Sequence, residues 1–309
     1  MAQQRLAYFN GAYIPESEVR IPFRDRGFIC GDAGYDMART FHGAPFKLEA
    51  HIARLFRTLR YLDIEISVTP EELKEICQSV VKCNAPLLTP YTDYWIAIRV
   101  TRGVPEDQRI EADPVGPSIL VECSPLPLAS RAKYYRDGIN AYVSSVPRVP
   151  PGCLSPRAKT HNYLNLLLAD REARRTDPEG WGIMLDHRGN LCEGIGNNIF
   201  FVTDGIVHTP QERFILPGIS RQTVLELCES LQLPVKQGDF DAYDLCGADE
   251  AFFTSTSLCL CPVRSVDGRR MRNITTPGPI TRSIMNAFAG LVGCDFVGQY
   301  LHYLEEAKI

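Results

Sequence analysis

The sequence predicts an α+β protein with two domains, and three observations support this. The chain has 309 residues, which is long for a single domain. Segments of alternating apolar residues are interspersed with segments whose apolar residues recur every three or four positions, the patterns of strands and helices. A proline-rich stretch at 124–130 separates two halves. We therefore expect a small N-terminal domain at 1–123, an interdomain linker at 124–135 and a larger C-terminal domain at 136–309.

In the N-terminal domain, turn residues and hydrophobic periodicity predict a hairpin, two helices and three further strands. Asn10-Gly11 is typical of a tight turn, so residues 7–14 should form two short strands. Residues 51–63 have the periodicity of an amphipathic helix. Pro70, followed by two glutamates, should begin a second helix at 70–83. The remaining strands are expected at 37–41, 94–101 and 117–123.

The C-terminal domain alternates between the two patterns. His187-Arg-Gly-Asn190 and Asp204-Gly205 indicate turns between strands. Strands are expected at 138–146, 182–186, 198–203, 206–209, 250–254 and 261–265. Helices are expected at 160–175, 219–231 and 280–291.

Composition excludes several classes of protein. Hydrophobic residues make up 45% of the chain, but no apolar run is long enough for a transmembrane helix. The first ten residues lack the apolar core of a signal peptide. A net charge of −4 argues against a nucleic-acid-binding surface. The eleven scattered cysteines offer no four-ligand zinc spacing, and they suit a reducing compartment. We therefore expect a cytoplasmic protein with no metal site that binds neither nucleic acid nor membrane.

One lysine, Lys159, stands where a proline-rich loop is expected to become a helix. The positive end of the helix dipole would disfavour a charged lysine there. A lysine with an ordinary pKa of ~10.4 is a poor nucleophile at neutral pH. Burial, or a neighbouring cation such as Arg157, would lower that pKa and suit the lysine to carbonyl chemistry. Taken alone, however, the spacing is more typical of a solvated surface lysine.

The motifs that follow Lys159 form an ordered set. They are Glu193-Gly-Ile-Gly-Asn-Asn-Ile-Phe200, Leu216-Pro-Gly-Ile-Ser-Arg221, Asp249-Glu-Ala-Phe-Phe-Thr-Ser-Thr-Ser257 and Pro262-Val-Arg-Ser-Val-Asp-Gly268. With Lys159, this order resembles the class IV aminotransferases, the fold-type IV enzymes that depend on pyridoxal 5'-phosphate. The resemblance runs from about Phe9 to about Phe288. It implies the fold of the D-amino acid aminotransferases, with a small α/β domain and a larger pseudo-barrel domain, and a homodimer with shared active sites.

The resemblance also implies roles for individual residues around the cofactor. Lys159 would form the Schiff base and would move a proton at the substrate carbon. Glu193 would face the pyridine nitrogen, although an isolated glutamate is more often an exposed loop residue. Tyr163 would hydrogen-bond the phenolic oxygen, or it could be an ordinary core tyrosine. The residues expected around the phosphate are Arg54, Ile219, Ser220 and Thr256.

Two of these candidate phosphate-binding residues also have an interpretation that involves no ligand. Gly218-Ile-Ser220 opens a helix, and the N–H groups of such a start bind anions. Ser220 could instead serve only as a helix cap. Arg54 could be a solvated helix arginine. By the same resemblance, the substrate-pocket candidates are Tyr35, Arg39, Arg99, Arg109, Ser257 and Leu258, and an arginine is the natural partner for a substrate carboxylate.

The chain resembles more than one member of the family. Residues 262–268 and 278–282 look like a branched-chain amino acid aminotransferase, whereas Tyr35-Asp36 resembles the D-amino acid and (R)-selective amine enzymes. We expect a transaminase that moves an amino group from a small or apolar donor to a 2-oxo acid by a ping-pong mechanism through the Lys159 Schiff base, with a branched-chain-like preference. The alternatives are an (R)-selective amine or D-amino acid transaminase, then an aminodeoxychorismate lyase, and last a binding module without catalysis.

Overall fold

The computed structural model of the chain describes residues 4–273 and 275–306. The chain divides into two compact units, residues 1–126 with 158–162, and residues 127–157 with 163–309. The α+β class predicted from the sequence is confirmed, since both units combine helices with a sheet. The chain passes between units at Leu126–Pro127, and the five residues 158–162 return to the first unit.

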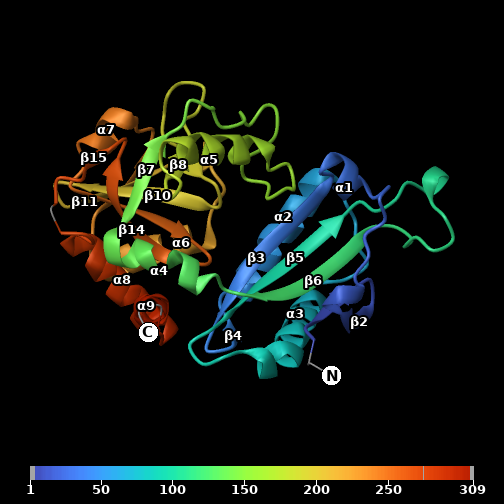
Figure 1. The fold of residues 1–309 in the computed structure, drawn as a ribbon. Helices are drawn as coiled ribbons and strands as arrows, with labels where there is room; N and C mark the ends of the chain where they lie inside the picture. Colours follow the sequence, from blue (N-terminus) through green and yellow to red (C-terminus); the bar gives the residue numbers. More distant parts are fainter. Residues whose placement is uncertain (1–3, 274, 307–309) are drawn as a thin grey trace. The chain divides into compact units, whose positions relative to one another are not determined.

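The first unit is built on a six-stranded sheet with the order β2-β1-β6-β5-β3-β4 (Figure 1). Its neighbouring strands are antiparallel. The strands are β1 (Leu6–Phe9), β2 (Ala12–Pro15), β3 (Ala33–Phe41), β4 (Ala44–Pro45), β5 (Tyr94–Thr101) and β6 (Ser118–Pro125). The predicted hairpin is confirmed, with Asn10 and Gly11 at positive φ between β1 and β2.

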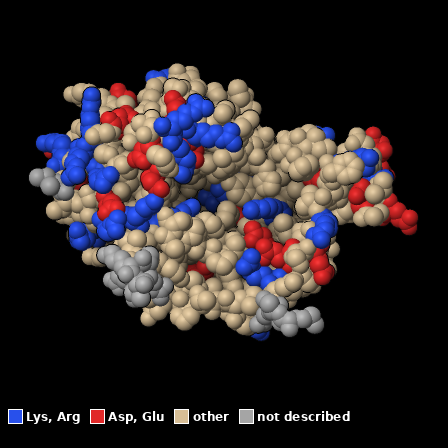
Figure 2. Space-filling view, in the orientation of Figure 1, with Lys and Arg blue, Asp and Glu red and all other residues tan. Residues whose placement is uncertain are grey.

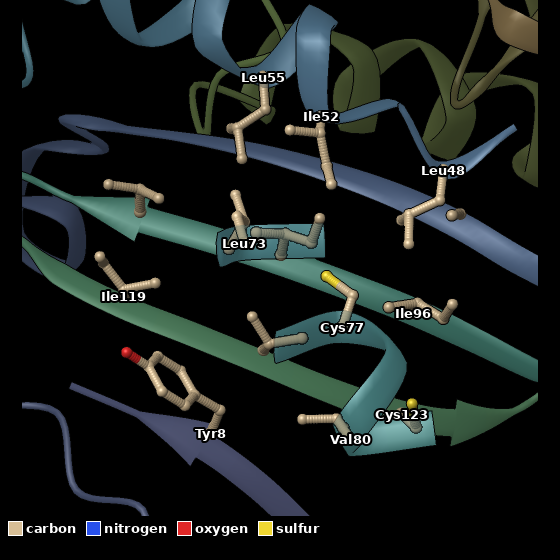
Figure 3. Close-up of a cluster of buried hydrophobic side chains, with 14 of the residues drawn as sticks. Tyr8, Leu48, Ile52, Leu55, Leu73, Cys77, Val80, Ile96, Ile119 and Cys123 are labelled. Carbon is tan, nitrogen blue, oxygen red and sulfur yellow. The ribbon is translucent and has the colours of Figure 1, made fainter. Parts of the chain in front are cut away.

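Two helices, α2 (Leu48–Leu62) and α3 (Pro70–Asn84), pack against one face of this sheet. The side chain of Thr69 and that of Glu72 cap each other's backbone at the start of α3, which fixes where that helix begins. In Figure 3, apolar side chains from both helices point toward the strands. The labelled members of this cluster are Tyr8, Leu48, Ile52, Leu55, Leu73, Cys77, Val80, Ile96, Ile119 and Cys123.

Alternation along the strands divides the sheet into two faces. In β3, Ala38 belongs to the core beneath the helices, so Asp36 and Gly34 point to the same face. Tyr35 therefore points to the opposite face, which we call the open face of the sheet. Tyr35 is the antiparallel partner of Arg99 on β5, so Arg99 shares the open face.

The second unit contains a nine-stranded sheet with the main order β12-β11-β10-β13-β14-β7-β8, to which β15 and β9 attach (Figure 1). The strands are β7 (Ile139–Val143), β8 (Trp181–Ile183), β9 (Glu193–Gly194), β10 (Asn197–Thr203), β11 (Ile206–Pro210), β12 (Val235–Gly238), β13 (Glu250–Ser255), β14 (Cys259–Val266) and β15 (Arg269–Arg270). The helices are α4 (Leu128–Asp137), α5 (Leu164–Thr176), α6 (Ile219–Ser230), α7 (Ala242–Cys246), α8 (Pro279–Val292) and α9 (Phe296–Glu306).

Three of the differences between the structure and the sequence-based expectation concern whole segments. The helix expected at 160–175 begins at Leu164, because residues 159–161 instead form backbone hydrogen bonds with β3. Residues 124–135, expected as a linker, contain the end of β6 and most of α4. The helix α9 was not expected at all.

Within the part of the chain that the structure describes, no helix has the length and apolarity needed to cross a membrane. On the face shown in Figure 2, positive and negative side chains are interspersed. That mixed surface agrees with the small net charge of −4.

Candidate active site

Lys159 lies in a short segment that pairs with β3 in the first unit through an isolated bridge, not at a helix start. Its backbone N–H donates to Thr58 Oγ1 at 3.1 Å, and its carbonyl accepts the Tyr35 N–H at 3.0 Å. The next residue, Thr160, forms an antiparallel bridge with Gly34. The dipole argument for Lys159 is therefore wrong. Backbone hydrogen bonds to Thr58 on α2 and to Tyr35 on β3 position this lysine instead.

The side chain of Lys159 lies above the ring of Tyr35, with Nζ 4.4 Å from the ring centroid. His161 lies two residues further along the same edge, and its ring is 5.3 Å from that of Tyr35. Lys159 and His161 therefore both lie beside the ring of Tyr35. Burial, followed by the charge of Arg99, lowers the pKa of His161 to about 4, so its imidazole is neutral near pH 7.

On the other face of β3, Arg54 forms a buried ion pair with Asp36. The two guanidinium nitrogens Nε and Nη2 each donate to this carboxylate at 2.8 Å. Arg54 is only 4% exposed, which rules out a solvated surface arginine. His51, one turn earlier on α2, lies 2.7 Å from the same carboxylate.

Glu193 is held in the second unit by three donors from separate segments. Arg148 Nε donates to Oε1 at 2.9 Å. The Leu216 N–H donates to Oε2 at 2.9 Å, and Asn198 Nδ2 lies 3.4 Å from the same oxygen. Glu193 is 4% exposed, so the reading as an exposed loop glutamate is wrong. Because every one of these partners donates, the arrangement suits the carboxylate form.

The turn that follows Glu193 approaches Tyr163. Gly196 has φ +71° in the turn between β9 and β10, a conformation that favours glycine. A Cβ at Gly196 would lie 3.5 Å from the Tyr163 hydroxyl oxygen. Tyr163 and Ile195 both pack against a small apolar cluster. The Tyr163 hydroxyl therefore lies beside the turn that follows Glu193.

The start of α6 is tied to Glu193 through the preceding loop. Asn198 Nδ2 donates to the Leu216 carbonyl at 3.0 Å, while the Leu216 N–H binds Glu193. The helix begins at Ile219 after Gly218, and no side chain caps its first N–H groups. Ser220 is therefore not the cap. A Cβ at Gly218 would lie 2.2 Å from Asn198 Oδ1, so only glycine allows this approach.

Thr256, Ser257 and Leu258 form the turn between β13 and β14. Asn198 on β10 pairs with Glu193 on one side and with Thr254 on the other, so this turn lies at the same end of the sheet as Glu193. Three side chains from α4 and α9 support the turn. Arg131 donates to Ser257 Oγ, Tyr135 donates to the Leu258 carbonyl, and Tyr300 donates to the Ser257 carbonyl at 2.8 Å.

The candidates thus form two groups, one in each unit. The first unit brings together Lys159, Tyr35 and Arg99 on the open face, with Arg54 on the other face of β3. The second unit brings together Glu193, Tyr163, Ile219, Ser220, Thr256, Ser257 and Leu258.

Two arginines stand apart from the first group. Arg39 is 2% exposed, its guanidinium carbon is 4.0 Å from the centroid of the Phe41 ring, and its Nη2 is 3.8 Å from Asp93. Arg109 is half-buried in the loop 102–117, between Glu106–Gln108 and further acidic residues.

Sequence reasoning missed Asp36, His51, Arg148 and Asn198 as parts of these groups. Asp36 directly follows Tyr35, and His51 precedes Arg54 by three residues, so spacing on a strand and a helix could have suggested a shared cluster. Arg148 is 45 residues from Glu193, and no local pattern links them.

Comparison with known proteins places this geometry in context. The sequence model of the family described as "Amino-transferase class IV" matches residues 34–266. A Methanocaldococcus jannaschii protein named "Putative branched-chain-amino-acid aminotransferase" is 33% identical over 283 residues, covering 91% of this chain and 94% of the relative. A Bacillus licheniformis D-alanine aminotransferase is 29% identical over 281 residues, covering 90% and 94%. The crystal structure of the Escherichia coli branched-chain amino acid aminotransferase has a TM-score of 0.83 at 30% identity, covering 94% and 95%.

Proposed function

The chain belongs to the class IV aminotransferases, and we propose that it is a pyridoxal-phosphate-dependent transaminase for small or apolar amino acids and 2-oxo acids. The group in the second unit carries this proposal. There a buried carboxylate, a tyrosine hydroxyl and a helix start without a side-chain cap lie at one end of one sheet. The similarity to proteins named as branched-chain and D-alanine aminotransferases supports the choice of substrates.

The residues present fit pyridoxal 5'-phosphate. A carboxylate such as Glu193, held by donors, suits the protonated nitrogen of a pyridine ring. The first N–H groups of α6, at Ile219 and Ser220, suit a phosphate because they lack a side-chain cap. The hydroxyl of Thr256 and the guanidinium of Arg54 would add donors to the phosphate, and the hydroxyl of Tyr163 would serve the phenolic oxygen.

When bound, the cofactor supplies a ring that accepts electrons from a bond at the substrate carbon. Lys159 would hold the cofactor through its amine and, once free, would move a proton at that carbon. Two hydrogen bonds hold the backbone of Lys159, so the starting point of its side chain would stay fixed in each half-reaction. Arg148 would keep Glu193 oriented and charged.

An amino-donor panel tests the substrate preference. We expect L-leucine to be the best donor among L-leucine, D-alanine and the two enantiomers of 1-phenylethylamine, with pyruvate and 2-oxoglutarate as acceptors. Faster turnover of D-alanine would instead favour the D-amino acid alternative, which the Bacillus licheniformis relative supports. Faster turnover of (R)-1-phenylethylamine would favour the amine alternative. Activity with none of the four donors would contradict the proposal.

Arg99 is our preferred partner for a substrate carboxylate. Arg99 lies opposite Tyr35 in the strand register, and Lys159 Nζ is 4.4 Å from the centroid of the Tyr35 ring. Its side chain is 33% exposed, and its ion pair with Glu122 is long, at 3.6 Å. Arg39 was another candidate from the sequence, but its contacts with Phe41 and Asp93 occupy it in a buried cluster.

We expect Arg99→Gln to slow the half-reactions of carboxylate-bearing substrates by about 10–100-fold, because a hydrogen bond to a charged group contributes about 1.5–3 kcal/mol. Stopped-flow rates for each half-reaction would measure this. Arg39→Ala should mainly lower the melting temperature, since it removes a buried partner of Asp93. The reverse pattern, with a rate loss in Arg39→Ala and none in Arg99→Gln, would contradict this assignment. Arg109→Ala tests the remaining candidate in the same way.

A homodimer with shared sites is also part of the proposal. Phe23, Phe28 and Ile29 of the first unit are 67%, 74% and 58% exposed, and exposed apolar side chains that lie close in sequence suggest a contact surface. Light scattering should give at least a dimer. Phe28→Glu should weaken it and lower activity, whereas Gln78→Glu, at an exposed polar position on α3, should do neither. A fully active monomer would contradict the shared site.

A further inference from the structure

Asp36 lies at the centre of a buried polar cluster that the proposed chemistry does not use directly. Its side chain is fully buried on β3, beneath α2. Arg54 donates two hydrogen bonds to it, one to each carboxylate oxygen, both at 2.8 Å. His51 Nδ1 is 2.7 Å from Oδ1. His51 and Arg54 are themselves 2% and 4% exposed.

The protonation states in this cluster follow from its surroundings. Burial would raise the pKa of Asp36, but the charge of Arg54, together with His51 and the hydrogen bonds from both, holds that pKa well below its usual range. Burial lowers the pKa of His51 despite the opposing effect of Asp36, so its ring is neutral. A carboxylate can only accept, so the neutral ring must carry its proton on Nδ1 and donate it to Asp36.

Stability alone is a poor explanation for this cluster. Burying an ion pair removes two charges from water, and a well-packed apolar pair of similar volume is often as stable or more so. A bidentate ion pair does, however, fix the relative orientation of the two side chains. Because Asp36 binds both Nε and Nη2, it fixes the plane of the Arg54 guanidinium and the direction in which its other edge points.

The face of α2 that carries this cluster also supports Lys159. His51, Arg54 and Thr58 are spaced three and four residues apart, so their side chains lie along one face of the helix. Thr58 Oγ1 accepts the N–H of Lys159 at 3.1 Å. One helix face therefore positions both a guanidinium and the backbone of the proposed reactive lysine.

We propose that Asp36 and His51 are positioning residues that orient Arg54 to bind the phosphate of the cofactor. Asp36 acts by fixing the guanidinium plane, and His51 acts by fixing Asp36. The aspartate of Tyr35-Asp36 thereby serves cofactor affinity and not the choice of substrate. The inference rests on the proposed cofactor function.

The test compares two cofactor forms that differ only in the phosphate. After bound cofactor is removed from the full chain, equilibrium dialysis measures the Kd of pyridoxal 5'-phosphate and of pyridoxal. Asp36→Asn should weaken the phosphate form by about 10–100-fold and leave pyridoxal unchanged, because one charged hydrogen-bonding contact is lost. His51→Gln should weaken the phosphate form less, by several-fold. Asp32→Asn is the matched control, since Asp32 pairs with Arg102 and Arg26 in the same unit and should change neither Kd.

A double-mutant cycle separates positioning from a general structural effect. If Asp36 acts through Arg54, adding Asp36→Asn to Arg54→Ala should cause no further loss of affinity. Equal losses for both cofactor forms, additive losses in the double mutant, or an unchanged Kd in Asp36→Asn would each overturn the inference. Should Asp36→Asn fail to fold, as judged by circular dichroism, His51→Gln decides by the same comparison of the two forms.

The wild-type protein separates this inference from the proposed function. If wild type binds neither form of the cofactor, the proposed function fails. If wild type binds the phosphate form tightly and the variants bind it equally well, only the positioning role fails.

Discussion

Replacing Lys159 with alanine is expected to abolish transamination and leave the protein folded. The lysine would supply both the covalent attachment of the cofactor and the amine that moves the proton. A positioned acid–base group alone contributes about 10²–10⁴-fold to a rate. The hydrogen bonds at this position come from the backbone N–H and carbonyl, which alanine retains. Steady-state turnover and the melting temperature measure the two parts of this expectation.

Lys74→Ala is the control for Lys159→Ala. Lys74 lies on α3, where its side chain is 38% exposed and pairs with Glu49. Its loss should leave turnover unchanged. More than about one per cent of wild-type turnover in Lys159→Ala, with no external amine added, would show that another group performs the acid–base step.

Glu193→Gln should lower turnover by about 10²–10³-fold, the range for the loss of one preorganised electrostatic contact. The glutamine has the same shape but no charge, so it cannot hold a proton on a ring nitrogen. One of its two ends must also present N–H groups to a donor, either Arg148 or the Leu216 N–H. The cofactor should still bind, because the phosphate and lysine contacts remain.

A second buried glutamate in the same unit provides the control. Glu250 is 4% exposed and accepts the backbone N–H groups of Ile280 and Thr281 at the start of α8. Glu250→Gln should lower the melting temperature with little effect on turnover. Unchanged turnover in Glu193→Gln, with cofactor bound, would show that Glu193 does not face the ring.

The parts of the fold that could be predicted are those with local causes. The hairpin at Asn10-Gly11 follows from one dipeptide, and α3 follows from Pro70, two glutamates and an apolar stripe. Helix α6 begins at Ile219, as its sequence indicated. In each case, residues that are close together in the sequence are sufficient to predict the element.

The segment around Lys159 could not be predicted in this way. Its periodicity from Tyr163 onward is helical, and extending it back to Thr160 was a reasonable local guess. Instead, the backbone of residues 159–161 forms hydrogen bonds with Ala33 and Tyr35, which lie more than a hundred residues earlier in the chain. Hydrogen bonds between such distant segments produce no hydrophobic periodicity in the sequence of either segment.

The candidate site shows the same division. The order of motifs led to the proposal of Lys159, Glu193 and the start of α6 as site residues. The partners that hold these residues come from far along the chain, as Arg148 does for Glu193 and Thr58 does for Lys159. The burial of Arg39 with Phe41 and Asp93 is likewise a property of packing, and it is the reason why we prefer Arg99 to Arg39.

The central claim is that Lys159 is the residue to which the cofactor attaches. Protein purified in the presence of pyridoxal 5'-phosphate can be treated with borohydride, which converts a lysine–aldehyde linkage into a stable secondary amine. Peptide mass spectrometry then locates the added phosphopyridoxyl group. We predict that it lies on the peptide that contains Lys159, and that Lys159→Ala protein carries none. A phosphopyridoxyl group on a different lysine of the wild-type protein, or on no lysine, would contradict this account.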